Sequence, residues 1–299
     1  MIRHTDFLIG YSCAIIAAAL FGSVSTVSKP VLSTINPVLL SSLVYLISGL
    51  TFTPIAKQTE RAKFSKKYYY LVLLTAAIGA AAAPIMFFIG LKLTTAADTA
   101  LLSNGETVFS ILFALVFFKE KLKRVGFGAV ALILVGVFIV TTNFDFDSSI
   151  MKFSFGNFLV IAATALWGLD NNISKIITRH IHVSRLVQLK SLVGGGISLL
   201  VVLLMGIPFN VQQTQVIPIV LVGVFGFAIS LYLYLHSIKR IGVVKASSLL
   251  SLSALFGLIF AALLLHESIG IYQLIAVVIM LIGVCLMYKN EPKKKEEGG

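Results

Sequence analysis

The chain has 299 residues, of which 58% are hydrophobic and only 12% are charged, and its mean hydropathy is +0.99. A soluble domain of this size cannot bury so much apolar surface, so the composition excludes a water-soluble globular protein and predicts one that folds in lipid. The two cysteines, Cys13 and Cys285, both lie in apolar runs, which argues against a disulfide framework or a metal cluster. The net charge is +12, but its distribution follows a membrane topology, so no nucleic-acid partner is expected.

Ten apolar segments follow one another along the chain, each near the roughly 20 residues that a helix needs to cross a bilayer. We predict membrane-spanning helices at residues 9–28, 37–56, 68–90, 95–118, 124–142, 153–174, 183–206, 214–238, 243–264 and 270–288. The predicted fold class is therefore an all-α integral membrane protein with ten transmembrane helices. An even number of spans places both ends of the chain on the same side of the membrane.

The lysines and arginines indicate which side that is. If the termini are cytoplasmic, 20 of the 24 basic residues fall in cytoplasmic segments, whereas Lys29, Lys92 and Lys152 fall outside and Lys190 lies within a span. Short cytoplasmic segments of membrane proteins carry an excess of positive charge. We therefore predict a multi-pass protein of the cell (cytoplasmic) membrane with both termini in the cytoplasm.

The second half of the chain repeats the first. Residues 10–29 and 156–175 share eight of twenty residues at a shift of 146 positions, and FALVFFKE, ending at Glu120, pairs with FAALLLHE, ending at Glu267, at a shift of 147. Because each repeat has five spans, the two repeats are inverted relative to each other, an arrangement typical of transporters with a binding site between the halves. The predicted parts are a first repeat at 1–147, a second repeat at 148–290 and a charged cytoplasmic tail at 291–299.

Three features recur in both halves in the same order. They are a small-residue first helix ending in AAALFG or ATALWG, an acidic residue closing the fourth helix and a glycine within the fifth, at Gly22 and Gly168, Glu120 and Glu267, and Gly136 and Gly283. With these features the chain resembles the drug/metabolite transporter superfamily, specifically its EamA-type members with ten helices in two five-helix repeats. The resemblance implies the export of amino acids or related metabolites.

Glu106 is the first candidate site residue, because it lies near the middle of the fourth span and a charge at that depth is energetically expensive. Asn104 lies close by in the sequence. We predict that these two residues bind an amine or hydroxyl group of the substrate, and that Glu106 couples transport to protons. The alternative is that Glu106 is a hydrogen-bonded packing residue at the interface between the repeats.

The sixth span carries a polar stripe. Trp167, Asp170, Asn171 and Ser174 have spacings of 3, 4 and 7, which places them on one face of a helix. We predict that Trp167 stacks on an apolar part of the substrate and that Asp170 and Asn171 complete the site; the alternative is a cytoplasmic helix end with an interfacial tryptophan. Lys190 in the seventh span is expected to extend toward the cytoplasmic interface, with pairing to Asp170 or to a substrate carboxylate as the alternative.

Two further candidates come from the eighth and ninth spans. Ser251 belongs to a hydroxyl-rich side of the ninth span, although serines also mediate close helix packing. Tyr232 and Tyr234 point to different faces, so at most one of them lines a cavity, and Tyr232 is the candidate. In the third span, Ala80–Ala83 followed by Pro84 is expected to kink the helix and to free backbone carbonyls near a cavity formed by spans 1, 3, 4, 6, 8 and 9.

These observations predict a secondary transporter, an exporter of small organic metabolites such as amino acids, that works by alternating access around a central cavity. Its expected partners are a small-molecule substrate, membrane lipid and protons, and a monomer is sufficient, with a homodimer left open. The alternatives are an uncoupled facilitator and a non-transporting membrane sensor or structural protein. An enzyme is not expected, and neither a cofactor nor a metal, because the chain has no HExxH, GxSxG or P-loop motif.

Overall fold

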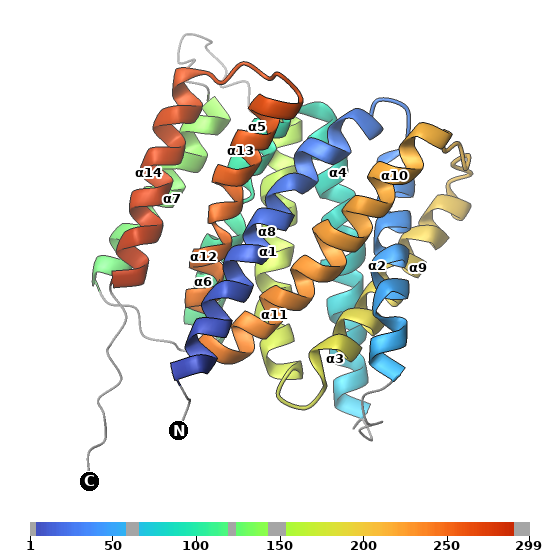
Figure 1. Cartoon of the computed structure of the whole chain (residues 1–299), viewed down its shortest axis with the longest axis horizontal. Coiled ribbons are helices and arrows are strands. Elements are labelled where there is room, and N and C mark those ends of the chain that lie inside the picture. The colour runs from blue at the N-terminus through green and yellow to red at the C-terminus, as the bar shows by residue number, and fades with distance from the viewer. Residues whose placement is uncertain (1–3, 58–65, 119–123, 143–153, 290–299) are drawn as a thin grey trace.

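The computed structural model describes residues 4–57, 66–118, 124–142 and 154–289, and every regular element in these ranges is a helix (Figure 1). Glu120 and the predicted tail at 291–299 lie outside them. The helices of the first half are α1 (His4–Val31), α2 (Pro37–Lys57), α3 (Lys66–Ala77), η1 (Ile78–Ala82), α4 (Ala83–Leu93), α5 (Ala96–Leu102), α6 (Gly105–Phe118) and α7 (Arg124–Thr142). Those of the second half are α8 (Phe155–Ile177), α9 (Val183–Leu204), α10 (Gln213–Leu221), η2 (Val222–Ile229), α11 (Ser230–Ile241), α12 (Val243–Leu250), α13 (Leu252–Leu264) and α14 (Ile271–Lys289).

The two halves have the same sequence of elements. In each half, two single helices are followed by a third span with a π-helical segment in its middle, by a fourth span in two pieces and by a fifth single helix. Seven of the resulting spans are long and apolar enough to cross a membrane, and α7 and α14 contain shorter apolar stretches. The remaining span, α8, is the sixth in chain order; it is 23 residues long and carries the predicted polar stripe. These segments form the predicted two sets of five.

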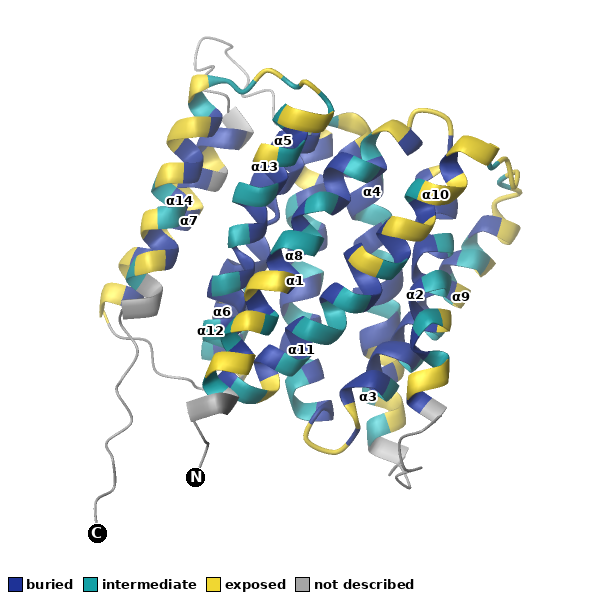
Figure 2. Cartoon of the chain, viewed as in Figure 1, coloured by how far each residue is buried: buried dark blue, intermediate teal, exposed yellow. Residues whose placement is uncertain are grey.

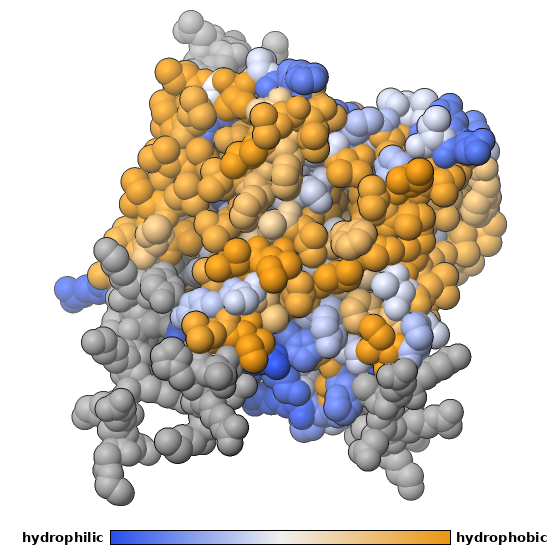
Figure 3. Space-filling model, in the orientation of Figure 1, coloured by the Kyte–Doolittle hydropathy of each residue, from blue (hydrophilic) through white to orange (hydrophobic). Residues whose placement is uncertain are grey.

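The outer surface of the molecule is apolar. Large side chains such as Leu204 and Ile271 are about three-quarters exposed, at 78% and 74%. Exposed positions follow the outward sides of the helices (Figure 2), and apolar side chains cover the middle of the face drawn in Figure 3, with hydrophilic ones toward its two ends. Such a surface would be unfavourable in water. The chain is therefore a multi-pass membrane protein, and α1 begins on the side where α14 ends (Figure 1).

Packing across the centre of the molecule shows the internal repeat directly. A Cβ added at Gly49 would lie 2.6 Å from the Leu192 side chain, and one at Gly195 would lie 2.8 Å from the Leu46 backbone. At the shift of 146, Gly49 corresponds to Gly195 and Leu46 to Leu192. The interface between α2 and α9 is therefore the same close glycine contact made twice, as expected for two halves related by a pseudo-twofold axis.

Two polar residues hold the ends of the helices on the side opposite the termini. Glu267 follows α13 and accepts hydrogen bonds from the backbone N–H groups of Ala96 (3.0 Å) and Ala97 (2.9 Å) at the start of α5. Lys29 donates to the carbonyl of Leu91 (2.9 Å) near the end of α4. A carboxylate at a helix N-terminus and a cation at a C-terminus both satisfy free backbone groups and oppose the helix dipole. The acidic residue that closes the fourth span of the second half thus fixes the fourth span of the first.

Candidate functional site

A cavity lies between the two halves and takes its lining from both. Its residues are Phe21, Tyr45, Gly79, Glu106, Trp167, Asp170, Asn171, Lys190, Gly226, Phe227, Ser230, Leu231, Tyr234 and Leu250. Besides the six spans expected from the sequence, α2 contributes Tyr45 and α9 contributes Lys190. The cavity volume is about 50 Å³, which leaves room for roughly three to five water molecules.

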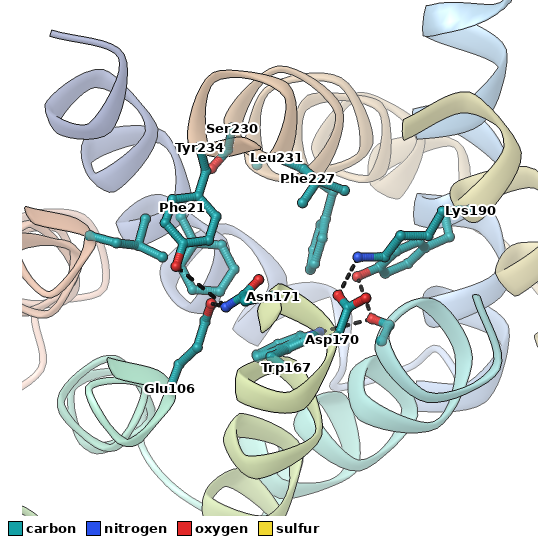
Figure 4. Close-up of a pocket in the computed structure, with 14 residues that line it drawn as sticks. Phe21, Glu106, Trp167, Asp170, Asn171, Lys190, Phe227, Ser230, Leu231 and Tyr234 are labelled. Carbon is teal, nitrogen blue, oxygen red and sulfur yellow. Dashed lines mark hydrogen bonds and ion pairs between the residues drawn. The ribbon is translucent and has the colours of Figure 1, made fainter. Parts of the chain in front are cut away.

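One polar cluster in the cavity centres on Glu106, at the start of α6. The side-chain amide of Asn171 donates to Glu106 Oε1 at 2.6 Å, and the same nitrogen lies 3.3 Å from the Tyr234 hydroxyl. Tyr234 in turn lies 2.7 Å from the hydroxyl of Ser247 in α12. Figure 4 shows Glu106, Asn171 and Tyr234 converging from three elements on one side of the cavity. Within the described residues, no Lys, Arg or His lies at ion-pair distance from Glu106.

The second polar cluster is an ion pair between Asp170 and Lys190 (Figure 4). Both side chains are only 2% exposed, and Ser174 also donates to Asp170 at 3.3 Å. Lys190 therefore does not extend to the cytoplasmic interface, which was the favoured expectation, and the alternative pairing with Asp170 holds instead. The physical reason is that a buried ammonium is stabilised most by a buried carboxylate within contact distance. Both α8 and α9 pack against α3 and η1, and this arrangement brings Asp170 within reach of Lys190.

Aromatic rings form the walls between these clusters. The rings of Phe21 and Trp167 meet edge to face with their centroids 5.7 Å apart, and Tyr45 packs on Phe227 at 4.9 Å. The Trp167 indole N–H (2.9 Å) and the Tyr45 hydroxyl (3.2 Å) both donate to the carbonyl of Gly79. This shared acceptor holds two walls of the cavity in fixed positions.

The Gly79 carbonyl is available because of the proline that follows. Gly79 lies in the π-helical segment η1, where a carbonyl bonds the N–H five residues later, as Ile78 does with Ala83. Five residues after Gly79 stands Pro84, which has no N–H. The Gly79 oxygen is thus left for side chains, so the expected freed carbonyl lies beside the cavity, at the point where a π-helical segment interrupts the α-helix of the third span.

Four of the predicted site residues line the cavity: Glu106, Trp167, Asp170 and Asn171. They come from the two places that the sequence singled out, the middle of the fourth span by its depth in the membrane and the polar face of the sixth span by its periodicity. The structure brings these separate segments together, since α6 packs against α8.

The other three predicted residues lie outside the cavity lining. Asn104 is two residues from Glu106, and its amide contacts Met280 Sδ at 3.1 Å. The hydroxyl of Ser251 lies 2.5 Å from that of Thr107, between α6 and the α12–α13 junction. Tyr232 packs on Phe52 and His236, with ring centroids 4.9 and 4.5 Å apart.

Several lining residues were not among the predicted ones. Tyr234, rather than Tyr232, lines the cavity, and Tyr45, Phe227 and Ser230 also contribute. The repeat offers one signal for this region: Gly79 and Gly226 are 147 positions apart and both line the cavity. In the part of the chain that the structure describes, no group of three or more His, Cys, Asp or Glu residues is placed to hold a metal ion.

Comparison with known proteins identifies the family. A profile of the EamA-like transporter family matches residues 8–142 and 154–289. An uncharacterized transporter of Methanothermobacter thermautotrophicus is 34% identical over 297 residues, covering 94% of this chain and 86% of that protein. One of Clostridium kluyveri is 25% identical over 293 residues, covering 94% of each. A solved crystal structure with 17% identity has the same fold, with a TM-score of 0.71 over 95% of this chain and 96% of the other. Because the profile matches both halves, the chain belongs to the EamA-like transporter family, as the recurring sequence features predicted.

Proposed function

We propose that this transporter moves a small organic metabolite with an amino group, such as an amino acid or a related amine, across the cytoplasmic membrane, with export as its direction. Membership of the family implies that the substrate is a small molecule and that the protein works in a membrane. The observation that carries the proposal is Glu106, a buried carboxyl that lines the central cavity and has no ion-pair partner in the described part of the chain. Such a residue within a membrane is a candidate for function by default.

The balance of charge in the cavity favours an amine. Asp170 and Lys190 neutralise each other, so an ionised Glu106 leaves the cavity with one unpaired negative charge. A substrate ammonium would offset that charge, and a cation also interacts favourably with the faces of aromatic rings such as Trp167. A ligand with a carboxylate as well would find the Asn171 amide and the Tyr234 hydroxyl as hydrogen-bond donors.

Proton coupling follows from the same carboxyl. A proton and a substrate ammonium can each neutralise Glu106, but not both at once. Substrate binding would then release a proton and proton binding would release substrate, which is the reciprocal linkage that an antiporter needs. An uncoupled facilitator would use the same cavity without this competition, and accumulation driven by a pH gradient distinguishes the two.

The size of the cavity supports a mechanism of alternating access. A volume of about 50 Å³ holds a few water molecules and not an amino acid. The helices that line it must separate to admit a substrate. Two inverted halves provide a way to do so, because each can adopt the conformation of the other and open the site to the opposite side.

The orientation and the parts of the chain remain as the sequence predicts them. The bias of lysine and arginine supports cytoplasmic termini. The repeats are proposed to span 1–147 and 148–290, and a monomer contains the complete cavity.

The test is counterflow in proteoliposomes loaded separately with amines, amino acids or neutral metabolites. Glu106→Gln keeps the side-chain size and the oxygen that accepts from Asn171, but removes the charge. We expect it to abolish uptake of amino compounds, and any residual transport to be independent of pH. Glu267→Gln is the matched control, because this carboxyl caps α5 outside the cavity.

If Glu106→Gln transports as the wild type does, with the same pH dependence, Glu106 has no role in coupling and the proposed mechanism fails. Uptake confined to neutral metabolites would reject the amine as the substrate class. Equal loss in both variants would indicate general damage to the fold and would reject a specific role for Glu106.

A further inference from the structure

A second, smaller cavity lies between α1, α4, α5 and α13. It is lined by Phe21, Gly22, Ser25, Phe87, Ala100, Ser103 and Ser253. Its volume is about 10 Å³, enough for about one water molecule. Three hydroxyl groups line it, and its described lining contains no charged side chain.

Every lining residue of this cavity has a counterpart in or beside the main cavity. At the shifts of 146 and 147 found in the sequence, the pairs are Phe21 with Trp167, Gly22 with Gly168, Ser25 with Asn171, Phe87 with Tyr234, Ala100 with Ser247, Ser103 with Leu250 and Ser253 with Glu106. Five of these seven counterparts line the main cavity, and Ser247 bonds Tyr234 there. The small cavity is therefore the equivalent of the main one in the other repeat.

The two cavities lie on opposite sides of one aromatic contact. Ser25 follows Phe21 by one helical turn in α1, and Asn171 follows Trp167 by one turn in α8. Because α1 and α8 run in opposite directions (Figure 1), Ser25 lies toward the side away from the termini and Asn171 toward the side of the termini. Phe21 contacts Trp167 at 5.7 Å and lines both cavities.

The hydroxyl of Ser25 is free to bind a hydrogen-bonding ligand. Ser25 is only 3% exposed, and its hydroxyl has no hydrogen-bond partner among the described residues. A buried polar group without a partner is unfavourable, so the site gains stability when a hydrogen-bonding group enters. The hydroxyl of Ser103 is already used by the carbonyl of Thr99 at 2.8 Å.

We propose that the small cavity is the second access site of the transport pathway, a subsite for an uncharged hydrogen-bonding group of the substrate, a hydroxyl or an amide. It opens to the side opposite the termini, and the Phe21 ring separates it from the main cavity. This inference rests on the proposed transport function. Its chemistry differs from that of the main cavity in one respect that matters: it offers hydroxyls where the main cavity offers a carboxyl.

The test is thiol accessibility, which needs no knowledge of the substrate. In the full-length chain with Cys13 and Cys285 replaced by alanine, single cysteines are placed by Ser25→Cys, Asn171→Cys and Ser198→Cys. Ser198 is the matched control, because it is also a buried serine without a partner among the described residues but lines neither cavity. A membrane-impermeant methanethiosulfonate is added to vesicles of either orientation, identified by a tag at the C-terminus.

We expect Ser25→Cys to react from the side opposite the termini at least tenfold faster than Ser198→Cys, and Asn171→Cys to react from the side of the termini. Phe21→Ala in the Ser25→Cys chain is expected to open a route from the side of the termini as well. An unreactive Ser25→Cys, or one that reacts only from the side of the termini without Phe21→Ala, would overturn the proposal.

Ser253→Cys provides a second probe of the same cavity if Ser25→Cys does not fold. Its expected reactivity is the same, and its failure has the same meaning. Accessibility is independent of Glu106, so a transport assay that removes Glu106 from the mechanism leaves this result standing. Conversely, an inert cavity in a protein that still transports through Glu106 would reject only the second site.

Discussion

The cavity at Glu106 and the cavity at Ser25 occupy equivalent positions in the two repeats, and they differ in their chemistry. The first is lined by Asn171 and Glu106, and the equivalent residues in the second are Ser25 and Ser253. Asp170, which also lines the first, corresponds to Val24, which is not part of the lining of the second. The partner of Asp170, Lys190, also corresponds to a valine, Val44. Val24 and Val44 lie in the hydrophobic core. One half of the molecule thus contains an ion pair at the place where the other half contains apolar side chains.

The backbone at these places is nevertheless the same. A Cβ on Gly79 would lie 2.4 Å from Asp170, and a Cβ on the equivalent Gly226 would lie 2.6 Å from Val24. Close helix approach at small residues therefore positions both halves alike. The comparison teaches that the shared backbone determines where a cavity forms, and that a few substitutions determine which cavity is charged.

The largest expected effect comes from making the polar half resemble the apolar one. Asp170→Val or Lys190→Met alone leaves an unpaired buried charge and should lower stability by about 3–5 kcal/mol. The double variant removes both charges and should be close to the wild type, since an apolar pair of similar volume often replaces a buried ion pair without loss. Thermal unfolding in detergent measures all three. Additive losses in the double variant would show that the pair is not a coupled unit.

A smaller effect is expected at the equivalent glycines. Gly79→Ala places a methyl group against Asp170, which is held by Lys190, and should destabilise the protein by about 1–3 kcal/mol. Gly226→Ala meets a single atom closer than 3.0 Å, a γ-methyl of Val24 at 2.6 Å, whereas Gly79→Ala meets three atoms of Asp170. Alanine is also the better helix former, so we expect a smaller loss of about 1 kcal/mol. The same unfolding measurement compares them. Equal losses would contradict this difference in crowding between the two glycines.

The smallest effect concerns the tyrosine of the charged cavity, whose counterpart is Phe87. Tyr234→Phe removes the hydroxyl that contacts Asn171 and Ser247. A neutral hydrogen bond contributes about 0.5–1.5 kcal/mol, so substrate affinity in the counterflow assay should fall about two- to tenfold. Tyr232→Phe, outside the cavity, is the control and should transport normally. If the two variants behave alike, Tyr234 does not contribute to binding.

The part of the site that could be predicted from sequence lies on single helices. The spacing of Trp167, Asp170 and Asn171 predicts one polar face, and all three line the cavity. A carboxyl in an apolar run, such as Glu106, is conspicuous because ionisable residues are rare at bilayer depth. Neither observation requires knowledge of any other helix.

Predictions that depend on helix rotation were less complete. Tyr232 and Tyr234 are two positions apart, so they lie on nearly opposite sides of a helix, and the sequence does not show which side faces the cavity. Asn104 and Ser251 lie beside cavity residues in the sequence but point to Met280 and Thr107. A membrane helix carries apolar residues on its lipid-facing side as well as on its buried side, so hydrophobicity alone does not mark the inward face.

The sequence by itself determined that the protein spans a membrane, that its two halves repeat each other and where polar groups enter the bilayer. These properties follow from local hydropathy and from similarity along the chain. Only the tertiary structure decided that Lys190 pairs with Asp170, that Tyr234 and Tyr45 face the cavity and that a hydroxyl-lined cavity lies opposite the charged one. The physical reason is that periodicity specifies which residues share a face of a helix, whereas packing between helices specifies which neighbour that face contacts.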